Sequence, residues 1–203
     1  SEMCIRDSLK FKDAGHILGS SFVEFKRSND NETRKILFSG DFGRPSQLVL
    51  KDPTQVFNVD YLVLESTYGD RLHDDEDPVQ ELARVINKSR ERGGVLVIPS
   101  FAVGRTQTLL YVIRELEERG DIPELTIYLD SPMAIDTTKV FKEHISDFNL
   151  ETRKQSLEGK PVFQPQKLKI CRGREESIAI NNISRDAIII SASGMATAGR
   201  ILH

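Results

Sequence analysis

Two loops near the start of the chain carry side chains that could bind a metal ion. His16 lies in residues 13–20 (DAGHILGS), and Asp41 lies in residues 39–44 (SGDFGR). An imidazole and a carboxylate on tightly turned backbone are ligand types that zinc and manganese use. The simpler alternatives are a turn histidine bonded to backbone and an aspartate in an Asx turn or helix cap. Two ligands cannot hold a catalytic metal, so either the chain supplies others or it is incomplete.

Glu65 adds a second carboxylate, because it directly follows the apolar run at residues 61–64. Its alternative role is to cap the adjacent Ser66 and Thr67. With His16 and Asp41, three successive strands would each end in a possible ligand or orienting group. Ends of neighbouring strands are where sites assemble in α/β proteins.

Two later turns have the composition of anion-binding loops. Residues 102–106 (AVGRT) and 191–195 (SASGM) place small side chains where a helix is expected to begin. Free backbone N–H groups at a helix N-terminus bind phosphate, and Arg105 could add a bidentate contact. Simple helix capping is the alternative for both. Neither turn has the GxxxxGK[ST] pattern, which argues against a P-loop NTPase.

The surrounding pattern predicts two pieces of different architecture. Residues 22–26 and 35–39 indicate a β-hairpin between the first two loops. From about residue 71 onward, strand and helix signals alternate, which favours a parallel α/β sheet, whereas the earlier pattern is antiparallel. Apolar runs predict buried strands at 61–64, 95–99, 125–129 and 187–190, and helices are expected at 78–92, 104–119, from 131 onward, and at 197–203. The polar stretch 149–169 gives no clear pattern.

Composition indicates an ordinary globular chain. The 203 residues include 28 basic and 31 acidic side chains, a net charge of −3, so nucleic-acid binding would need a local basic patch. No apolar run is long enough to span a membrane. Cys4 and Cys171 are too few and too far apart for a disulfide framework, which fits a reducing compartment and a cytoplasmic location.

Both ends of the sequence suggest a fragment. Residues 1–8 are interpreted as a non-native leader, because residues 3–8 look like translated sequencing adapter, and they are left out of the expected fold. The helix at 197–203 looks cut within its second turn. The expected domains are therefore 9–70 and a C-terminally truncated 71–203.

These motifs together resemble the β-CASP nucleases of the metallo-β-lactamase superfamily. Residues 13–20 and 39–41 look like the third and fourth metal-binding motifs, and residues 65–71 look like the first additional β-CASP motif. Similarity to the β-CASP insertion covers residues 99–107 and 129–134 at its start and 191–195 and 199–203 in its late part. The nearest kin appear among prokaryotic relatives of the pre-mRNA 3′-end cleavage endonuclease.

The resemblance implies part of a metallo-β-lactamase αββα sandwich, followed by most of a β-CASP α/β domain with a mainly parallel sheet. It implies a two-zinc ribonuclease in which Asp41 bridges both metals, His16 binds one, and Glu65 orients a later histidine. Asp41 and Glu65 would then be catalytic. The residues expected to contact substrate are Ser66, Thr67, Tyr68, Arg105, Ser193 and Gly194.

The sequence departs from the family pattern in two places. The HxHxDH motif, expected before residue 11, and the two histidine motifs expected after residue 203 are absent, so the chain alone is expected to bind zinc weakly and to lack useful nuclease activity. The expected partner is single-stranded RNA, and no membrane association is expected. A homodimer is one possible assembly. A DNA nuclease of the same superfamily and a non-catalytic scaffold are the alternatives.

Overall fold

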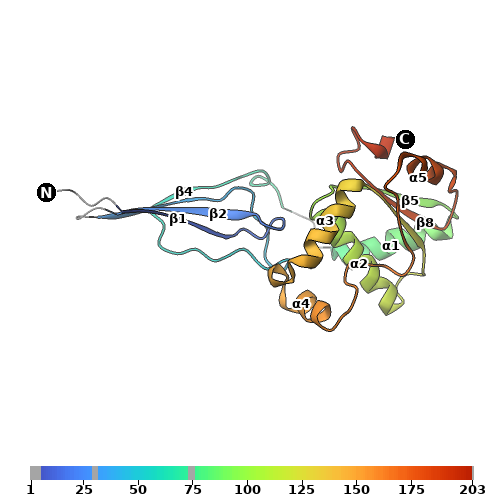
Figure 1. Ribbon diagram of the computed structural model, residues 1–203, viewed down its shortest axis with the longest axis horizontal. Coiled ribbons are helices and arrows are strands. Elements are labelled where there is room, and N and C mark those ends of the chain that lie inside the picture. Colours follow the sequence, from blue (N-terminus) through green and yellow to red (C-terminus); the bar gives the residue numbers. More distant parts are fainter. Residues whose placement is uncertain (1–5, 29–31, 73–75, 203) are drawn as a thin grey trace. The chain divides into compact units, whose positions relative to one another are not determined.

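The computed structural model describes residues 6–28, 32–72 and 76–202 (Figure 1). The chain forms two compact units. The first comprises Ser1–His73 and Asp147–Thr152, and the second comprises Asp74–Ser146 and Arg153–His203. Each unit is built around its own sheet.

The first unit holds a four-stranded sheet in the order β1-β2-β3-β4. The strands are β1 (Arg6–Asp13), β2 (Ser21–Ser28), β3 (Thr33–Phe38) and β4 (Tyr61–Val63). β1, β2 and β3 are antiparallel neighbours, which confirms the predicted hairpin. β4 joins β3 in parallel, although the sequence predicted an antiparallel first half. The long connection between β3 and β4 permits this pairing, because parallel neighbours need a crossover of about a dozen residues or more.

The first strand begins earlier than the sequence predicted. Residues 1–8 were left out of the expected fold, yet Arg6, Asp7 and Ser8 pair with the far end of β2, where Ser28 is the last partner. Backbone hydrogen bonds extend the ladder here without requiring an apolar pattern in the side chains, so periodicity alone could not reveal it.

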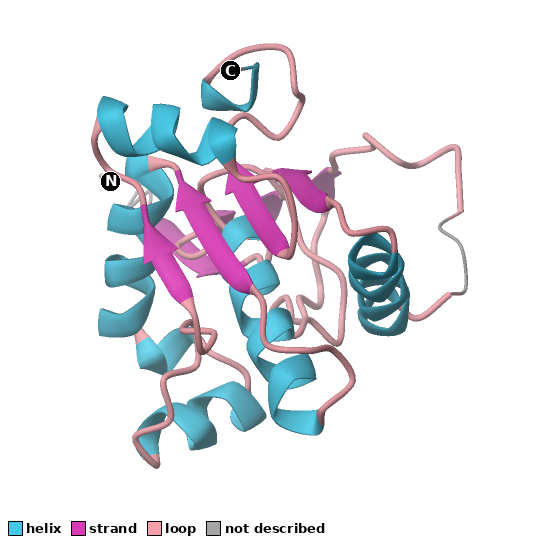
Figure 2. Cartoon of the chain, turned by 90° about the vertical axis from the view of Figure 1, so that its right-hand side faces the viewer, coloured by secondary structure: helices cyan, strands magenta, loops and turns pink. Residues whose placement is uncertain are grey.

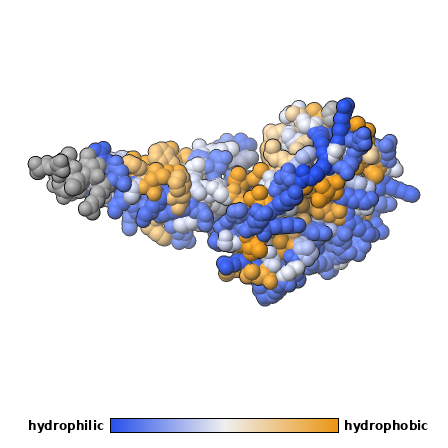
Figure 3. All heavy atoms as spheres, in the orientation of Figure 1, coloured by the Kyte–Doolittle hydropathy of each residue, from blue (hydrophilic) through white to orange (hydrophobic). Residues whose placement is uncertain are grey.

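The two faces of this sheet differ. Phe22 and Leu37 are buried with Ala14 on one face, where Val56 and Val59 of the long connection cover them. Paired residues on neighbouring strands point to the same face of the sheet. On the opposite face, this pairing brings apolar side chains from all four strands together. Its members are Leu9, Phe11, Val23, Phe25, Ile36, Phe38, Tyr61 and Val63. We call this set the apolar face; five of its side chains are exposed, and Figure 3 shows apolar surface over these strands.

A short segment from later in the chain completes the first unit. Phe148 is buried and forms an isolated antiparallel bridge with Leu50. The Asn149 side-chain amide donates to the Gln47 carbonyl at 2.8 Å, and the Thr152 hydroxyl donates to the Leu48 carbonyl at 3.0 Å. The segment therefore anchors the connection that precedes β4.

The second unit holds a parallel sheet in the order β5-β8-β6-β7, with helices flanking it (Figure 2). Its strands are β5 (Val95–Pro99), β6 (Thr126–Asp130), β7 (Leu168–Ile170) and β8 (Ala187–Ser191). Its α-helices are α1 (Pro78–Glu91), α2 (Arg105–Arg119), α3 (Pro132–Glu143), α4 (Leu150–Leu157), whose first residues lie in the first unit, and α5 (Arg174–Ala179). The predicted α/β class and parallel sheet are confirmed.

The predicted helix boundaries follow from ordinary capping. Asp77 caps α1 by accepting a hydrogen bond from the Val79 amide at 2.9 Å, and Ser131 caps α3 through the Ala134 amide at 3.2 Å. α2 ends at Gly120, whose φ of 75° is the left-handed conformation that glycine adopts without strain.

The least patterned parts of the sequence were predicted poorly. The expected helix at 197–203 is a series of turns followed by the 3-10 helix η3 (Arg200–Leu202), and His203 lies outside the described residues. Gly199, with a φ of 83°, breaks the helical path. β7, α4, α5 and the 3-10 helices η1 (Ile145–Asp147) and η2 (Ile180–Asn182) were not predicted, since none has a sustained apolar period. In the described part of the chain, none of the helices is long and apolar enough to cross a membrane.

Candidate functional site

The topology of the first unit brings three strand ends to one edge of its sheet. β1 and β3 are both antiparallel to β2, and β4 is parallel to β3, so β1, β3 and β4 run in the same direction. His16, Asp41 and Glu65 each follow the carboxyl end of one of these strands within three residues. The predicted convergence of three chemically active side chains at neighbouring strand ends follows from this strand order.

The loops that carry His16 and Asp41 are in direct contact. The Gly43 amide donates to the Ala14 carbonyl at 2.8 Å. A side chain on Gly43 would collide with the Gly15 carbonyl, which also accepts a hydrogen bond from the Gln47 side chain. Glycine at position 43 is therefore required for the close approach of the loops.

The His16 loop is further fixed by its own side-chain contacts. The Ser20 hydroxyl accepts from the His16 amide at 3.0 Å and from the Ile17 amide at 3.2 Å. Gly15 has a φ of 65°, and a Cβ there would lie 2.8 Å from the Pro53 nitrogen. The backbone of the loop is therefore preorganised, while the His16 ring is exposed.

Glu65 connects the β4 end to the Asp41 loop. Its carboxylate accepts from the Phe42 amide at 3.1 Å and from the Thr67 hydroxyl at 2.8 Å. These hydrogen bonds lower the pKa of Glu65, with the Thr67 hydroxyl the largest cause and the charge of nearby His16 a smaller one. Glu65 is therefore an ionised group that holds the residue next to Asp41, a contact the sequence did not predict.

His16 and Asp41 are the donors that could hold a metal at this edge. Both side chains are exposed, and an imidazole nitrogen with a carboxylate oxygen is a donor pair that zinc accepts. Within the described residues, no group of three or more His, Cys, Asp or Glu side chains is placed to hold a metal ion. The pair fits part of a zinc site, because a catalytic zinc takes three protein ligands.

The predicted substrate-contact residues after Glu65 form an exposed turn. The Gly69 amide closes it by donating to the Ser66 carbonyl at 3.0 Å. The Arg71 guanidinium lies over the Tyr68 ring, 5.9 Å from its centroid. The Thr67 hydroxyl donates a hydrogen bond to the Glu65 carboxylate, so Thr67 also helps to position Glu65.

In the second unit, the remaining predicted residues lie at the carboxyl edge of the parallel sheet. Ser191, the last residue of β8, is paired with Pro99 on one side and Asp130 on the other. The loops that follow β5 and β8 therefore leave the sheet side by side. They carry Arg105 in the first case, and Ser193 and Gly194 in the second.

A fully buried glutamine that the sequence did not single out shapes the loop before Arg105. The Gln107 amide nitrogen donates to the Thr138 hydroxyl at 2.9 Å and to the Ala102 carbonyl at 3.2 Å. Its side-chain oxygen accepts from the Gly104 amide at 2.8 Å. Gln107 thus ties the start of α2 to α3. Its place three and six residues before the inward-facing Leu110 and Ile113 was the available signal.

An ion pair between partly buried Arg200 and buried Asp130, also missed, holds the loop after β8. The Arg200 guanidinium donates to the Asp130 carboxylate at 2.7 Å and to the Cys171 carbonyl at 3.0 Å. Ser177 of α5 donates to the same carboxylate at 2.8 Å. These contacts fix the far end of the loop that begins with Ser193. Asp130 follows an apolar strand, as Asp41 and Glu65 do, and this was the signal.

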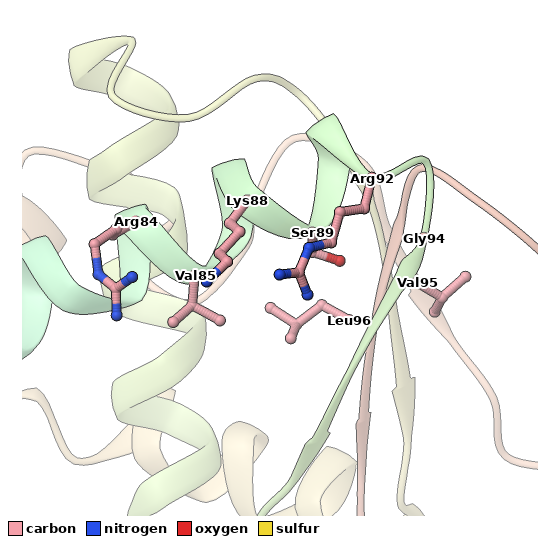
Figure 4. A pocket seen from close by; sticks show the side chains of 8 residues that line it. All are labelled: Arg84, Val85, Lys88, Ser89, Arg92, Gly94, Val95 and Leu96. Atoms are coloured by element: carbon pink, nitrogen blue, oxygen red, sulfur yellow. The ribbon is translucent and has the colours of Figure 1, made fainter.

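A separate basic groove lies along α1 (Figure 4). Arg84, Lys88 and Arg92, spaced four residues apart, line an open cavity of about 430 Å³ beside Val95 and Leu96 of β5. Arg84 is paired with Glu81. Among the residues that the structure describes, no carboxylate or imidazole lines this groove, so these residues offer charge without acid–base chemistry.

Comparison with known proteins agrees with this arrangement. Residues 106–203 match the Beta-Casp domain. The chain is 37% identical to Ribonuclease TTHA0252 of Thermus thermophilus over 97% of its own length and 44% of that relative. It is 32% identical to an RNase J-like protein of Methanocaldococcus jannaschii over 99% of the chain and 46% of the relative. Transcription termination factor FttA of Thermococcus kodakarensis is 34% identical over 94% of the chain and 30% of the relative.

The parallel sheet with flanking helices defines an α/β protein. Over residues 106–203, the chain belongs to the Beta-Casp domain family. It spans less than half the length of each of these relatives.

Proposed function

We propose that the whole protein to which this chain belongs is a zinc-dependent nuclease that hydrolyses RNA phosphodiester bonds. The observation that carries the proposal is the junction of the His16 loop, the Asp41 loop and Glu65 through the Gly43–Ala14 and Phe42–Glu65 hydrogen bonds. Relatives named as ribonucleases align with nearly the full chain, which supports RNA as the substrate.

In this proposal His16 would be a ligand of one zinc ion and Asp41 a ligand of both, and the remaining ligands would come from other parts of the whole protein. The bound zinc would act as a Lewis acid on the phosphodiester. Glu65 positions the Asp41 loop through the Phe42 amide, and its ionised form accepts this hydrogen bond more strongly than a neutral carboxyl would. Its low pKa supports this role at neutral pH, in addition to the role expected from the family resemblance.

The apolar face supports the further proposal that the first unit is part of an αββα sandwich. Leu9, Phe11 and Tyr61 are each more than half exposed, and the eight positions of the apolar face form one continuous apolar area across the four strands. An antiparallel sheet with such a face needs a second layer, and sheets in a sandwich pack face to face. We propose that a second sheet of the same whole protein covers it.

Substrate binding is proposed to use two groups of residues. Ser66, Thr67 and Tyr68 lie beside Glu65 in the exposed turn of the first unit. In the second unit, Arg105 is exposed at the start of α2, beside the loop of Ser193 and Gly194. The Arg105 guanidinium can make a bidentate contact with an RNA phosphate. The amides of Gly104, Arg105 and Thr106 already donate within the protein, so the phosphate contact at the start of α2 rests on the guanidinium.

The test uses the whole protein with labelled single-stranded RNA and DNA of one sequence. We expect zinc in the purified protein, cleavage of RNA, and a loss of more than about 100-fold on His16→Ala or Asp41→Asn, since even groups behind the ligands are worth 10- to 100-fold. His144→Ala is the matched control, because His144 is an exposed histidine in the other unit whose Nδ1 lies 3.0 Å from the Val140 carbonyl oxygen.

The same assay separates the alternatives. Cleavage of DNA in preference to RNA would favour a DNA nuclease, and a protein with neither zinc nor cleavage would favour a scaffold. For the 203-residue chain alone, we expect weak zinc binding and no useful cleavage. Activity of that chain which disappears on His16→Ala would overturn this last expectation.

A further inference from the structure

Phe101 is an aromatic side chain in an unusual position. It follows the carboxyl end of β5 and is 53% exposed, whereas the preceding Ser100 is buried. Two other phenylalanines of the second unit, Phe141 and Phe163, are buried and meet edge to face at 5.9 Å. The exposed ring lies at the edge where ligands bind in parallel sheets, so it is available for contact with a ligand.

The ring is held rigidly although it is exposed. The Phe101 carbonyl accepts from the Thr106 hydroxyl at 2.8 Å and from the Thr106 amide at 3.3 Å. A Cβ atom on Gly194 would lie 2.8 Å from both the nitrogen and Cδ2 of Phe101. The Gly194 backbone therefore packs directly against the ring and leaves the remainder of the ring open to solvent.

The surroundings of the ring match the chemistry of single-stranded nucleic acid. Exposed Met133 begins α3 and exposed Met195 follows Gly194, so two flexible apolar side chains share this edge of the sheet. Arg105 supplies a cation four residues after Phe101. Non-specific single-strand binding combines an aromatic ring for base stacking with cations for the backbone. Methionine adapts to partners of varied shape.

We infer that Phe101 is a stacking platform for a nucleobase of single-stranded RNA, placed beside the loops proposed to bind its phosphates. The inference rests on the proposed function for its substrate class. It adds a direct contact to the base, whereas Arg105, Ser193 and Gly194 would contact only the backbone. Stacking accepts any base, so the site should bind RNA without strong sequence preference.

Binding of a uridine dodecamer to the 203-residue chain tests the inference. The comparison ligand is a ribose-phosphate dodecamer without bases. We expect Phe101→Ala to weaken binding of the uridine dodecamer about tenfold, within the 1–3 kcal/mol typical of a stacked base, and to leave binding of the base-free polymer unchanged. Phe101→Tyr should retain wild-type affinity for both.

Tryptophan fluorescence gives a second readout, because the chain contains no tryptophan. Emission of Phe101→Trp should be quenched by the uridine dodecamer and not by the base-free polymer. Phe57→Trp is the matched control, since Phe57 is 68% exposed and lies in the first unit, so its emission should not change.

The outcomes separate this inference from the proposed function. Equal affinity of wild type and Phe101→Ala for the uridine dodecamer, with unchanged Phe101→Trp emission, would overturn the stacking role and leave the nuclease proposal standing. Binding of neither polymer by the wild-type chain would also overturn the stacking role. If the whole protein did not cleave RNA but RNA binding still depended on Phe101, the proposed nuclease function would be overturned. The proposed stacking site would remain supported.

Discussion

The two sheets of this protein contain similar apolar strands with opposite burial. In β8 of the second unit, Ile188 and Ile190 are at most 1% exposed. In β4 of the first unit, Tyr61, Leu62 and Val63 are each more than 50% exposed. β8 is central in a parallel sheet that helices cover, whereas β4 is the edge strand of a sheet with an uncovered apolar face. An apolar run therefore indicates a strand, and the layers around it decide its burial.

The largest expected difference is between the stability effects of truncating a side chain in β8 and one in β4. Ile188→Ala should lower the free energy of unfolding by about 2–5 kcal/mol, because it leaves a cavity in a fully packed core. Val63→Ala should change it by no more than about 0.5 kcal/mol in this chain, because the side chain is already exposed. Urea unfolding followed by circular dichroism measures both, and equal losses would contradict the difference in layering.

Once a second sheet covers the apolar face, as we propose for the whole protein, Val63→Ala should become costly there too. The comparison between the chain and the whole protein therefore tests the proposed sandwich. A Val63→Ala effect that stays below about 0.5 kcal/mol in the whole protein would argue against a covering layer.

The next effect contrasts a buried cation with an exposed one. Arg114 is buried in α2 and donates to Glu118 at 2.6 Å, Gln155 at 2.6 Å and the Val162 carbonyl at 3.3 Å. Arg114→Ala should cost about 2–3 kcal/mol, since it removes several charge-assisted hydrogen bonds and leaves buried acceptors unpaired. Arg84→Ala, which removes the exposed pair with Glu81, should cost much less than Arg114→Ala, because solvent screens an exposed ion pair.

Both Arg114→Ala and Arg84→Ala remove one positive charge from the second unit, so net charge cannot explain a difference between them. The measurement is again the urea midpoint at neutral pH. Equal midpoints would show that the buried network of Arg114 contributes no more than a surface pair.

The sequence predicted the residues at the strand ends of both units better than the contacts that hold those residues in place. The parallel sheet, the helix caps at Asp77 and Ser131, and the convergence of His16 and Asp41 at one edge follow from local patterns of two to eight residues. The Phe42–Glu65 and Arg200–Asp130 contacts join residues 23 and 70 positions apart, and no local pattern encodes such contacts. The burial predicted for β4 was wrong for a related reason, since burial depends on layers supplied by distant parts of a chain.

Two buried glutamates should give the units opposite responses to pH. In the second unit, burial raises the pKa of Glu117 above its ordinary 4.5, and one of its oxygens has no hydrogen-bond partner among the described residues. A raised folded pKa means that the folded state binds more protons, so this group makes stability fall as pH rises from 4.5 through the folded value. Glu117→Gln should remove that fall and stabilise the second unit at neutral pH.

Glu24 of the first unit should behave in the reverse way. Its hydrogen bond with Lys12, at 2.8 Å, lowers the pKa of Glu24 below 4.5. Its stabilising effect is therefore complete above 4.5 and is lost as pH falls through the lower folded value. Glu24→Gln should reduce stability at neutral pH and weaken the loss in acid. Urea midpoints between pH 3 and about pH 7 measure both variants, and slopes of the same sign would contradict the assignments.

The smallest expected effect asks whether the sheet edge of the second unit binds an RNA backbone on its own. Arg105→Ala should reduce the slope of log affinity against log salt for a uridine dodecamer by about 0.7, because one phosphate contact is lost from a single strand. Lys88→Ala, in the α1 groove, should leave the slope unchanged if RNA follows the loops at the sheet edge. If only Lys88→Ala changed the slope, the RNA would be inferred to follow α1. Binding in this unit would then not depend on the loops at the strand ends.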